Sequence, residues 1–336
     1  MQTKRPLVVV DEAIPFLNGV LDPWCDVRAL PGAAVAAADL RDADALVVRT
    51  RTRCDAALLG GSSVRLVVTA TIGFDHIDCA WCAAHGIEVA TAAGCNARGV
   101  LQWVAGVLAL DARRRGWRPA EKCLGIVGVG HVGELVRQYA EAWGFRTVCC
   151  DPPREAREHR GFCSLEAVAE AADVLTLHTP LDATTRHLVD ARLVARMKRD
   201  ALLVNASRGG VVATEAVLDS PLRFAFDVWE GEPAIDPRTL ERAEAATPHI
   251  AGYSVQGKAN ATAAAVRAIA RRFGPPLGDW YPPEALRPVP RPIGWEEMCA
   301  TIGRYFDVEA ETQALKRAPE AFERMRDAYR YRAEYF

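Results

Sequence analysis

The chain has 336 residues, of which half are hydrophobic and 25% charged, and its net charge is −2. The chain is longer than a single hydrophobic core usually supports, so we predict two or more domains. The charge balance gives no electrostatic reason to expect nucleic acid or an anionic membrane as a partner. The N-terminus does not resemble a signal peptide, and no apolar run approaches the ~20 residues that span a bilayer. We therefore expect a cytoplasmic protein with no membrane partner.

Apolar runs of strand length, separated by helical patterns, open the chain at 7–10, 45–48, 66–70 and 88–90. Such alternation predicts a parallel sheet with crossover helices.

Cys79 and Cys82 form a C-x-x-C with His85 just beyond it. Neither a second ligand pair nor a thioredoxin-like context accompanies them, so the motif predicts a helix after Asp78. No metal site is expected.

A long helix is predicted over 98–115, and residues 123–133 then read C-L-G-I-V-G-V-G-H-V-G. After the apolar strand, Gly128, Gly130 and Gly133 supply a tight turn, a close backbone approach to a pyrophosphate and close helix packing. The pyrophosphate is expected on the helix N-terminus, at His131 and Val132, where free N–H groups favour an anion. The pattern predicts a dinucleotide-binding site.

Asp151 lies eighteen residues after Gly133, at the end of the next apolar strand. A carboxylate there accepts a hydrogen bond from the ribose 2′-hydroxyl and repels the 2′-phosphate of NADP. NAD is the expected cofactor.

A second series of strands is predicted after the glycine motif, at 147–150, 174–177, 202–205, 224–228 and in the short stretch before Pro248. The fold class predicted from both series is α/β, with two doubly wound parallel-sheet domains. Three polar motifs follow the last three strands: N-A-S-R-G-G at 205–210, D-V-W-E-G-E-P at 227–233 and T-P-H-I-A-G-Y at 247–253. In open parallel sheets ligands bind outside the carboxyl ends of the strands, so these motifs should converge where the nicotinamide lies.

The three motifs supply the groups that oxidise a 2-hydroxy acid. Arg208 offers a planar fork that matches a carboxylate. His249 titrates near neutrality and takes the hydroxyl proton as hydride leaves. Glu232 is expected to orient the imidazole and stabilise its charged form. We predict these three as the catalytic residues.

An Ala-rich helix is predicted over 257–273, and prolines crowd the stretch 275–292 as a linker. Beyond it, Phe322, Met325, Tyr329 and Phe336 recur at helical spacing. A fragment too small to form its own core must bury such a stripe against another surface. We expect the stripe to pair two copies of the chain as a homodimer, and the alternative is that it docks onto the substrate-binding domain of the same chain.

The chain resembles the D-specific 2-hydroxyacid dehydrogenases, which carry an Arg, a Glu and a His in this order. The resemblance covers about residues 7–270. It rests on V-D-E at 10–12, A-D-A-L-V-V-R-T at 43–50, T-A-T-I-G-F-D-H at 69–76, G-C-N-A at 94–97, C-D-P-P at 150–153, D-V-W-E-G-E-P at 227–233 and H-I-A-G-Y-S at 249–254. Within that family these motifs most resemble those of the members that oxidise 4-phospho-D-erythronate to 2-oxo-3-hydroxy-4-phosphobutanoate in vitamin B6 biosynthesis.

The family arrangement implies a split substrate-binding domain at 1–96 and 255–280, an inserted NAD-binding Rossmann domain at 97–254, and a C-terminal dimerisation segment at 281–336. It also implies a small phosphorylated 2-hydroxy acid as substrate. Thr50, Thr71 and Tyr253 would contact this substrate. The residues that would contact NAD, besides the glycine loop, are Asp151, Thr179, Ala206, Ser207, Arg208, Asp227 and Gly252.

Two other functions stay open. One is a related dehydrogenase, such as one acting on 3-phosphoglycerate, for which the phosphate could be bound by Arg49, Arg51 and Arg53. The other is a binding protein that senses NAD(H) without turnover, because a fold alone does not establish a function.

Overall fold

The computed structural model describes residues 5–287 and 290–336, so Pro288 of the proline-rich stretch lies outside the described residues. The chain divides into two compact units. The first unit combines Met1–Asn96 with Val255–Arg287, and the second combines Ala97–Ser254 with Pro288–Phe336. No helix in the described ranges is both long enough and apolar enough to cross a membrane.

The first unit is built on a five-stranded parallel sheet in the order β2-β1-β3-β4-β5. Its strands are β1 (Leu7–Asp11), β2 (Asp26–Leu30), β3 (Ala45–Val48), β4 (Leu66–Thr69) and β5 (Glu88–Thr91). Its helices are α1 (Ala56–Leu59), α2 (Cys79–Ala84) and α10 (Val255–Phe273). The chain adds β2 on one side of β1 and then crosses to β3 on the other side. A switch point therefore lies between β1 and β3, where α/β sheets bind ligands.

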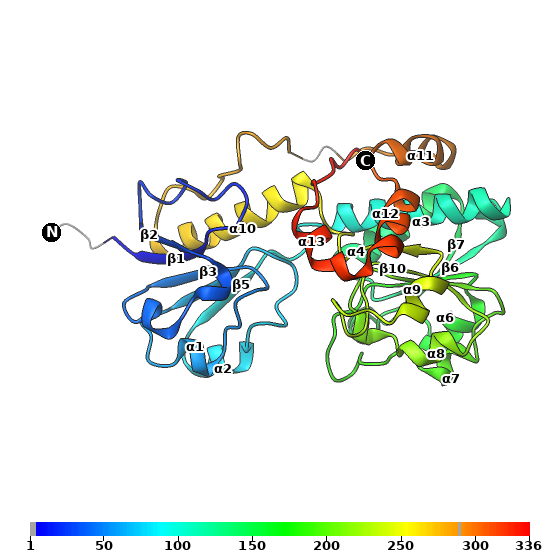
Figure 1. Cartoon of the computed structure of the whole chain (residues 1–336), viewed down its shortest axis with the longest axis horizontal. Coiled ribbons are helices and arrows are strands. Elements are labelled where there is room, and N and C mark those ends of the chain that lie inside the picture. Colours follow the sequence, from blue (N-terminus) through cyan, green and yellow to red (C-terminus); the bar gives the residue numbers. More distant parts are fainter. Residues whose placement is uncertain (1–4, 288–289) are drawn as a thin grey trace. The chain divides into compact units, whose positions relative to one another are not determined.

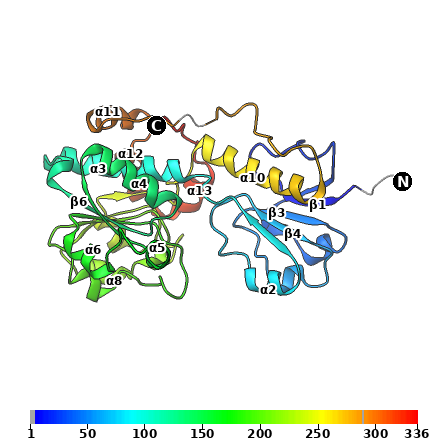
Figure 2. The ribbon, with the colours of Figure 1, turned by 180° about the vertical axis from the view of Figure 1, so that it is seen from behind.

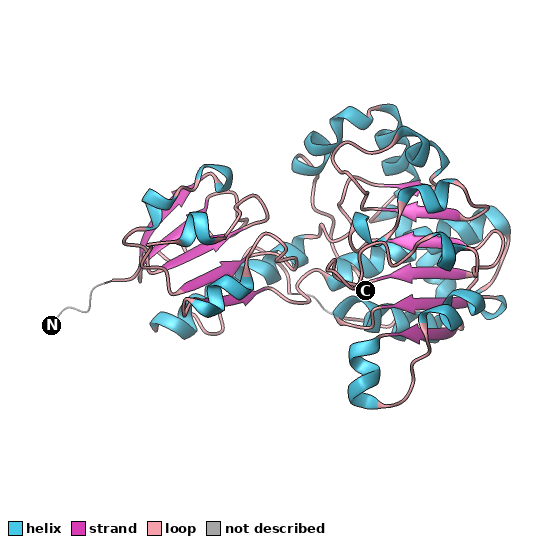
Figure 3. Ribbon diagram, turned by 90° about the horizontal axis from the view of Figure 1, so that it is seen from below, coloured by secondary structure: helices cyan, strands magenta, loops and turns pink. Residues whose placement is uncertain are grey.

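The second unit has a six-stranded parallel sheet in the order β11-β10-β9-β8-β6-β7 (Figure 3). Its strands are β6 (Cys123–Val127), β7 (Arg146–Cys150), β8 (Val174–Leu177), β9 (Leu202–Asn205), β10 (Arg223–Phe226) and β11 (Ala245–Ala246). The helices are α3 (Ala97–Arg115), α4 (His131–Trp143), α5 (Pro152–Glu158), α6 (Leu165–Ala171), α7 (Ala191–Val194), α8 (Thr214–Leu218), α9 (Pro237–Arg242), α11 (Trp295–Thr301), α12 (Val308–Arg317) and α13 (Phe322–Asp327). The switch point of this sheet lies between β6 and β8.

Both faces of the second sheet are covered, which explains why its strands read as unbroken apolar runs. On one face α3 and α4 lie side by side (Figure 2). Successive strand residues alternate between the two cores, so that Leu202 and Val204 pack with α3 whereas Leu203 packs on the opposite side.

The predicted fold class is confirmed, and the predicted strands all form, with ends shifted by one or two residues. Strand β2 was not predicted, because its residues are exposed or half-buried at the sheet edge and so lack an apolar pattern. The C-x-x-C forms part of α2, which Asp78 caps by accepting a hydrogen bond from the Trp81 N–H, as predicted.

The apolar stripe of the C-terminal segment was expected to need a second copy of the chain to cover it, and this argument for a dimer is wrong. Helix α13 ends at Asp327, and Phe322 and Phe336 are each 1% exposed within the two cores of the second unit. Helix α12 also covers the open edge of the sheet, where the Thr312 hydroxyl accepts a hydrogen bond from the N–H of Ala246 in β11. The chain thus buries the stripe against itself. Figure 1 shows the backbone of α12 and α13 as part of the second unit. The homodimer stays a prediction that this stripe no longer supports.

We expect Phe322→Ala to lower the free energy of unfolding by about 3–5 kcal/mol, because the ring is buried and its removal leaves a cavity. Chemical denaturation measures the loss. The control is Leu286→Ala, whose side chain is among the exposed large hydrophobics, at 81% exposure. It should change stability by less than about 0.5 kcal/mol. Equal effects of the two substitutions would contradict the docking of the C-terminal segment.

Candidate active site

The glycine loop after β6 forms an open cradle. Gly128 has φ of +83°, and a Cβ there would lie 2.8 Å from the backbone of His178. A Cβ on Gly133 would lie 2.0 Å from the carbonyl oxygen of Gly128, so helix α4 packs closely on the turn. Beside Gly130, in contrast, no described atom lies within 4 Å of the position that a Cβ would take. The three glycines thus have the three properties that a bound pyrophosphate requires.

Helix α4 begins at His131, and no described side chain caps this end. The first N–H groups of the helix, at His131 and Val132, therefore face the cradle without an intrahelical partner. Beside the loop, the buried hydroxyl oxygen of Thr179 has no hydrogen-bond partner among the described residues. A buried polar atom without a partner is costly, so this hydroxyl fits a contact with a bound ligand.

Asp151 braces the glycine loop from the end of β7. One carboxylate oxygen accepts from the N–H of Val129 at 2.7 Å, and the other accepts from the N–H of Arg154 at 2.9 Å as the cap of α5. A carboxylate has further acceptor sites, so a ribose hydroxyl can still be bound. Arg154 is itself paired with Glu134 and Glu158, at 2.9 and 2.7 Å.

The loop after β9 carries Ala206, Ser207 and Arg208, and the buried Asn205 shapes it. The Asn205 side chain accepts from the N–H and the hydroxyl of Ser207 and donates to the carbonyl of Arg208 at 2.9 Å. No role was predicted for Asn205 from the sequence. An amide at the end of an apolar strand was the available signal, because a buried amide must find partners.

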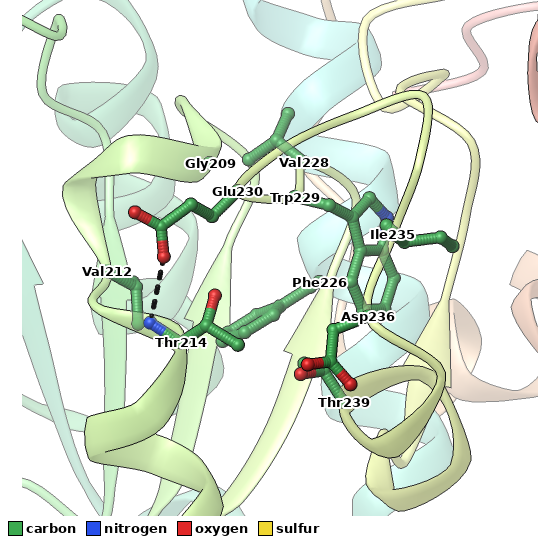
Figure 4. Close-up of a pocket in the computed structure, with 10 residues that line it drawn as sticks. All are labelled: Gly209, Val212, Thr214, Phe226, Val228, Trp229, Glu230, Ile235, Asp236 and Thr239. Atoms are coloured by element: carbon green, nitrogen blue, oxygen red, sulfur yellow. Dashed lines mark hydrogen bonds between the residues drawn. The ribbon is translucent and has the colours of Figure 1, made fainter.

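The loops after β9 and β10 touch each other. A Cβ on Gly209 would lie 2.0 Å from the carbonyl oxygen of Trp229, so only glycine fits beside that backbone. Glu230 joins the two loops by accepting from the N–H of Thr214 at 3.1 Å (Figure 4). The cavity that these residues line has a volume of about 10 Å³, which suits one water and no substrate.

His249 and Glu232 form the central pair. Nδ1 of His249 lies 2.5 Å from Oε1 of Glu232, and Oε2 of the same carboxylate accepts from the N–H of Trp229 at 3.0 Å. Burial raises the pKa of Glu232, but the hydrogen bond and the charge of His249 outweigh it and hold this pKa below its ordinary value. The carboxylate therefore stays ionised and fixes which imidazole nitrogen faces it.

Asp227 holds the turn on which His249 sits. Its buried carboxylate accepts from the Thr247 hydroxyl at 2.6 Å and from the N–H groups of Ile250 and Ala251 at 2.7 and 2.9 Å. The His249 N–H donates to the Asp227 carbonyl at 2.8 Å, and His249 has φ of +58°, in the left-handed region. A non-glycine residue holds that conformation only where its surroundings impose it. Gly252 and Tyr253 continue this turn.

Thr50 and Thr71 lie in the first unit, after β3 and β4 respectively. The Thr71 hydroxyl lies 2.7 Å from that of Thr69 and donates to the Gly73 carbonyl at 3.0 Å. Next to Thr50, the Nε of Arg49 donates to the buried carboxylate of Asp11 at 2.9 Å. Asp11 and Arg49 end β1 and follow β3, so this ion pair marks the switch point of the first sheet.

We expect Gly133→Ala to weaken NADH binding at least tenfold, roughly 1.4 kcal/mol, because the added methyl group meets the Gly128 carbonyl and displaces the loop. Quenching of protein fluorescence by NADH measures the affinity. Gly278→Ala is the control, since no described atom lies within 4 Å of the position its Cβ would take. Unchanged affinity in the Gly133 variant would refute the assignment of this loop.

Comparisons with known proteins identify relatives of this chain. Residues 97–251 match the family described as D-isomer specific 2-hydroxyacid dehydrogenase, NAD binding domain. An erythronate-4-phosphate dehydrogenase of Ectopseudomonas mendocina is 46% identical over 274 residues, which cover 80% of this chain and 73% of that protein. One of Bacteroides fragilis is 40% identical, with 97% of both chains covered.

Among solved structures, D-lactate dehydrogenase from Aquifex aeolicus, complexed with NAD and lactic acid, has a TM-score of 0.69 at 24% identity, covering 80% of this chain and 96% of that one. NAD⁺-bound 3-phosphoglycerate dehydrogenase of Entamoeba histolytica has a TM-score of 0.70 at 22% identity, covering 84% and 100%. These two likenesses concern the fold. The sequence relatives, together with the matched domain, show that the chain belongs to the D-isomer specific 2-hydroxyacid dehydrogenases, an NAD-dependent family of oxidoreductases.

Proposed function

We propose that the protein oxidises 4-phospho-D-erythronate with NAD to 2-oxo-3-hydroxy-4-phosphobutanoate, a step of pyridoxal 5′-phosphate biosynthesis. The observation that carries the proposal is the hydrogen-bonded pair of His249 and Glu232 at the carboxyl edge of a dinucleotide-binding sheet. The relatives from Ectopseudomonas mendocina and Bacteroides fragilis supply the substrate class, since both are named erythronate-4-phosphate dehydrogenases.

The proposed catalytic roles follow from the chemistry of each group. Arg208 binds the substrate carboxylate with its planar fork and so orients C2. Nε2 of His249 accepts the proton of the C2 hydroxyl while the C2–H bond breaks, and Glu232 stabilises the imidazolium that forms. NAD, when bound, accepts the hydride, and the glycine loop, Asp151, Thr179, Ala206, Ser207 and Gly252 are the residues that would hold it. Tyr253, Thr50 and Thr71 are proposed substrate contacts.

For the substrate phosphate we propose Arg49 among the arginines of the first unit. Its guanidinium is braced by the buried Asp11 at the switch point and is still 32% exposed. Arg53, in contrast, is 85% exposed and pairs with Asp55 at 2.7 Å, away from any such brace. A fixed guanidinium loses less conformational entropy when it binds an anion than a mobile one.

The cytoplasmic location and the homodimer remain proposals of the same kind. The competing functions are a dehydrogenase for 3-phosphoglycerate or another D-2-hydroxy acid, and an NAD(H)-sensing protein without turnover. The intact pair of His249 and Glu232 favours an enzyme over a sensor, because binding alone needs no acid–base group.

The substrate is tested by following NADH absorbance with 4-phospho-D-erythronate, D-erythronate and 3-phospho-D-glycerate in parallel. We expect kcat/KM for 4-phospho-D-erythronate to exceed the other two at least tenfold, since the phosphate and the four-carbon length are both recognised. Preference for 3-phospho-D-glycerate would select the related dehydrogenase. NADH binding without turnover of any 2-hydroxy or 2-oxo acid would select the sensor.

Arg49→Lys keeps the charge but loses the bidentate fork, so KM for the phosphorylated substrate should rise about tenfold while KM for D-erythronate stays unchanged. Steady-state kinetics on both acids gives the comparison. Arg53→Lys is the matched control and should leave both constants as in the wild type. A rise in both KM values for Arg49→Lys would mean that this residue does not recognise the phosphate.

His249→Ala should lower kcat by roughly 10²–10⁴-fold with NADH affinity retained, the usual size of a general acid–base contribution. Exposed His187, which also pairs with a glutamate at 2.5 Å, provides the control, and His187→Ala should keep most of the activity. A loss below about tenfold in His249→Ala would remove the proposed role.

Glu232→Gln should lower kcat at neutral pH. Because the pKa of Glu232 is held below its ordinary value, the wild-type carboxylate is charged through the neutral range and holds the His249 imidazole by the hydrogen bond at Nδ1. The wild type loses this support only when the pH falls through that lowered pKa, whereas the glutamine side chain is uncharged at every pH. The pH profile of kcat, measured for both proteins, should show a deficit of the variant that is largest at neutral pH and becomes smaller as Glu232 of the wild type is protonated. Equal kcat of the two proteins at neutral pH would count against the pairing in solution.

A further inference from the structure

The C-terminal tail runs along the loop that follows His249. Ser254 and Arg332 form a parallel backbone bridge, and the Ser254 hydroxyl donates to Glu334 at 2.6 Å. Figure 1 draws this tail in red beside the first turns of α3. No function was assigned to Arg332 from the sequence, because the backbone carbonyls that it binds are about 80 residues and more away along the chain.

Arg332 is 6% exposed, and its guanidinium gathers backbone carbonyls of this loop. One terminal nitrogen donates to Ile250 at 3.0 Å and to Tyr253 at 3.2 Å, and the other donates to Ala251. The second nitrogen also donates to the carbonyl of Gly99, in α3, at 2.8 Å. Four carbonyls from two segments thus converge on one planar cation.

The cation is also held in place from its other sides. Its guanidinium carbon lies 4.5 Å from the centre of the Phe306 ring, which favours a buried cation. The Tyr329 hydroxyl lies 3.4 Å from the nitrogen that binds Ile250 and Tyr253. A buried charge is tolerated only where such partners replace water. Both terminal nitrogens of Arg332 have these partners, while its buried Nε has no hydrogen-bond partner among the described residues.

Two side chains of opposite charge hold the loop that follows His249, one by its N–H groups and the other by its carbonyl groups. Asp227 accepts from the N–H groups of Ile250 and Ala251, whereas Arg332 donates to the carbonyls of the same two residues. The peptide group between Ile250 and Ala251 is therefore fixed at both ends of its dipole, its carbonyl by Arg332 and its N–H by Asp227. His249 itself has the left-handed φ of +58°, a conformation of higher energy that this support helps to hold.

We propose that Arg332 is a positioning residue for the oxidation, which fixes the 250–253 loop and through it the imidazole of His249. The proposal rests on the proposed role of His249. Arg332 contacts neither substrate nor cofactor in this scheme, and its effect passes through the backbone. A misplacement of about 1 Å at a reacting group costs on the order of 10²-fold in rate, so loosening this loop should be visible in kcat.

The first experiment compares Arg332→Met with Arg330→Met, an exposed arginine two residues away that serves as the matched control. We expect kcat to fall on the order of 10–100-fold in Arg332→Met, with the Kd for NADH within about twofold of the wild type. The deuterium isotope effect from C2-deuterated substrate should rise, because hydride transfer becomes slower than the other steps. A loss of folded protein alone would lower kcat and leave KM, the pH profile and the isotope effect unchanged.

Arg332→Lys keeps the proposal testable if the methionine variant does not fold. An ammonium group keeps the charge but reaches fewer carbonyls in one plane, so this variant should retain an intermediate kcat. Full wild-type kcat and isotope effect in both variants would overturn the proposal.

A double-mutant cycle separates positioning from a general structural effect. If Arg332 acts through the imidazole, Arg332→Met should cause almost no further loss in a His249→Ala background. Multiplicative losses would show that Arg332 acts independently of His249, and would overturn the proposal. The cycle uses whichever acid of the panel the wild type oxidises best, so it does not depend on the identity of the substrate. His249→Ala with wild-type activity would instead refute the proposed function of that residue.

Discussion

The buried carboxylate of Asp227 is the interaction on which the geometry of the candidate active site depends. It is 1% exposed and accepts three hydrogen bonds, from the hydroxyl of Thr247 and from two N–H groups after His249. Burial raises the pKa of this carboxyl group. A charge without partners at this depth would cost several kcal/mol, so the turn must keep a conformation in which its donors face the carboxylate. That conformation places His249 opposite Glu232.

Support for this turn comes from residues far apart in the sequence. Thr247 receives a hydrogen bond from the indole of Trp103 in α3 at 2.9 Å, and its carbonyl accepts from Trp229 at 3.0 Å. On the other side, Arg332 of the C-terminal tail binds the carbonyls of the turn. Helix α3, the loop after β10 and the C-terminal tail thus all hold the turn that carries His249. Such an arrangement explains how a residue with positive φ is maintained without a glycine.

The cofactor side of the site depends on a different constraint, the close approach of backbone to backbone. Gly133 and Gly209 each leave no room for a Cβ, because a carbonyl oxygen lies 2.0 Å from the position it would occupy. Gly130 differs, since the space beside it is open. Two glycines of the site therefore serve packing, and a third leaves access for a ligand. Asp151 braces the same loop by accepting a hydrogen bond from the N–H of Val129.

The α/β class, nearly every strand and the glycine loop could be predicted from the sequence. The pairing of Glu232 with His249 could be predicted as well, since the two side chains meet at 2.5 Å. The catalytic roles of Arg208, Glu232 and His249 stay predictions. Those features depend on local patterns: apolar runs buried on both faces, glycines at fixed spacing and polar residues at strand ends. Because parallel strands end at one edge, the convergence of the last three motifs could be predicted without coordinates. Strand β2 was missed because its exposed edge position removes the apolar pattern.

What holds these groups in place became visible only in the folded chain. The roles of Asn205, Asp227 and Arg332 depend on hydrogen bonds to backbone atoms, which leave no pattern in the side-chain sequence. The apolar stripe of the C-terminal segment looked like a surface for a second copy, but the chain covers it with its own cores. A sequence shows that a residue must be buried, whereas the fold decides which surface buries it.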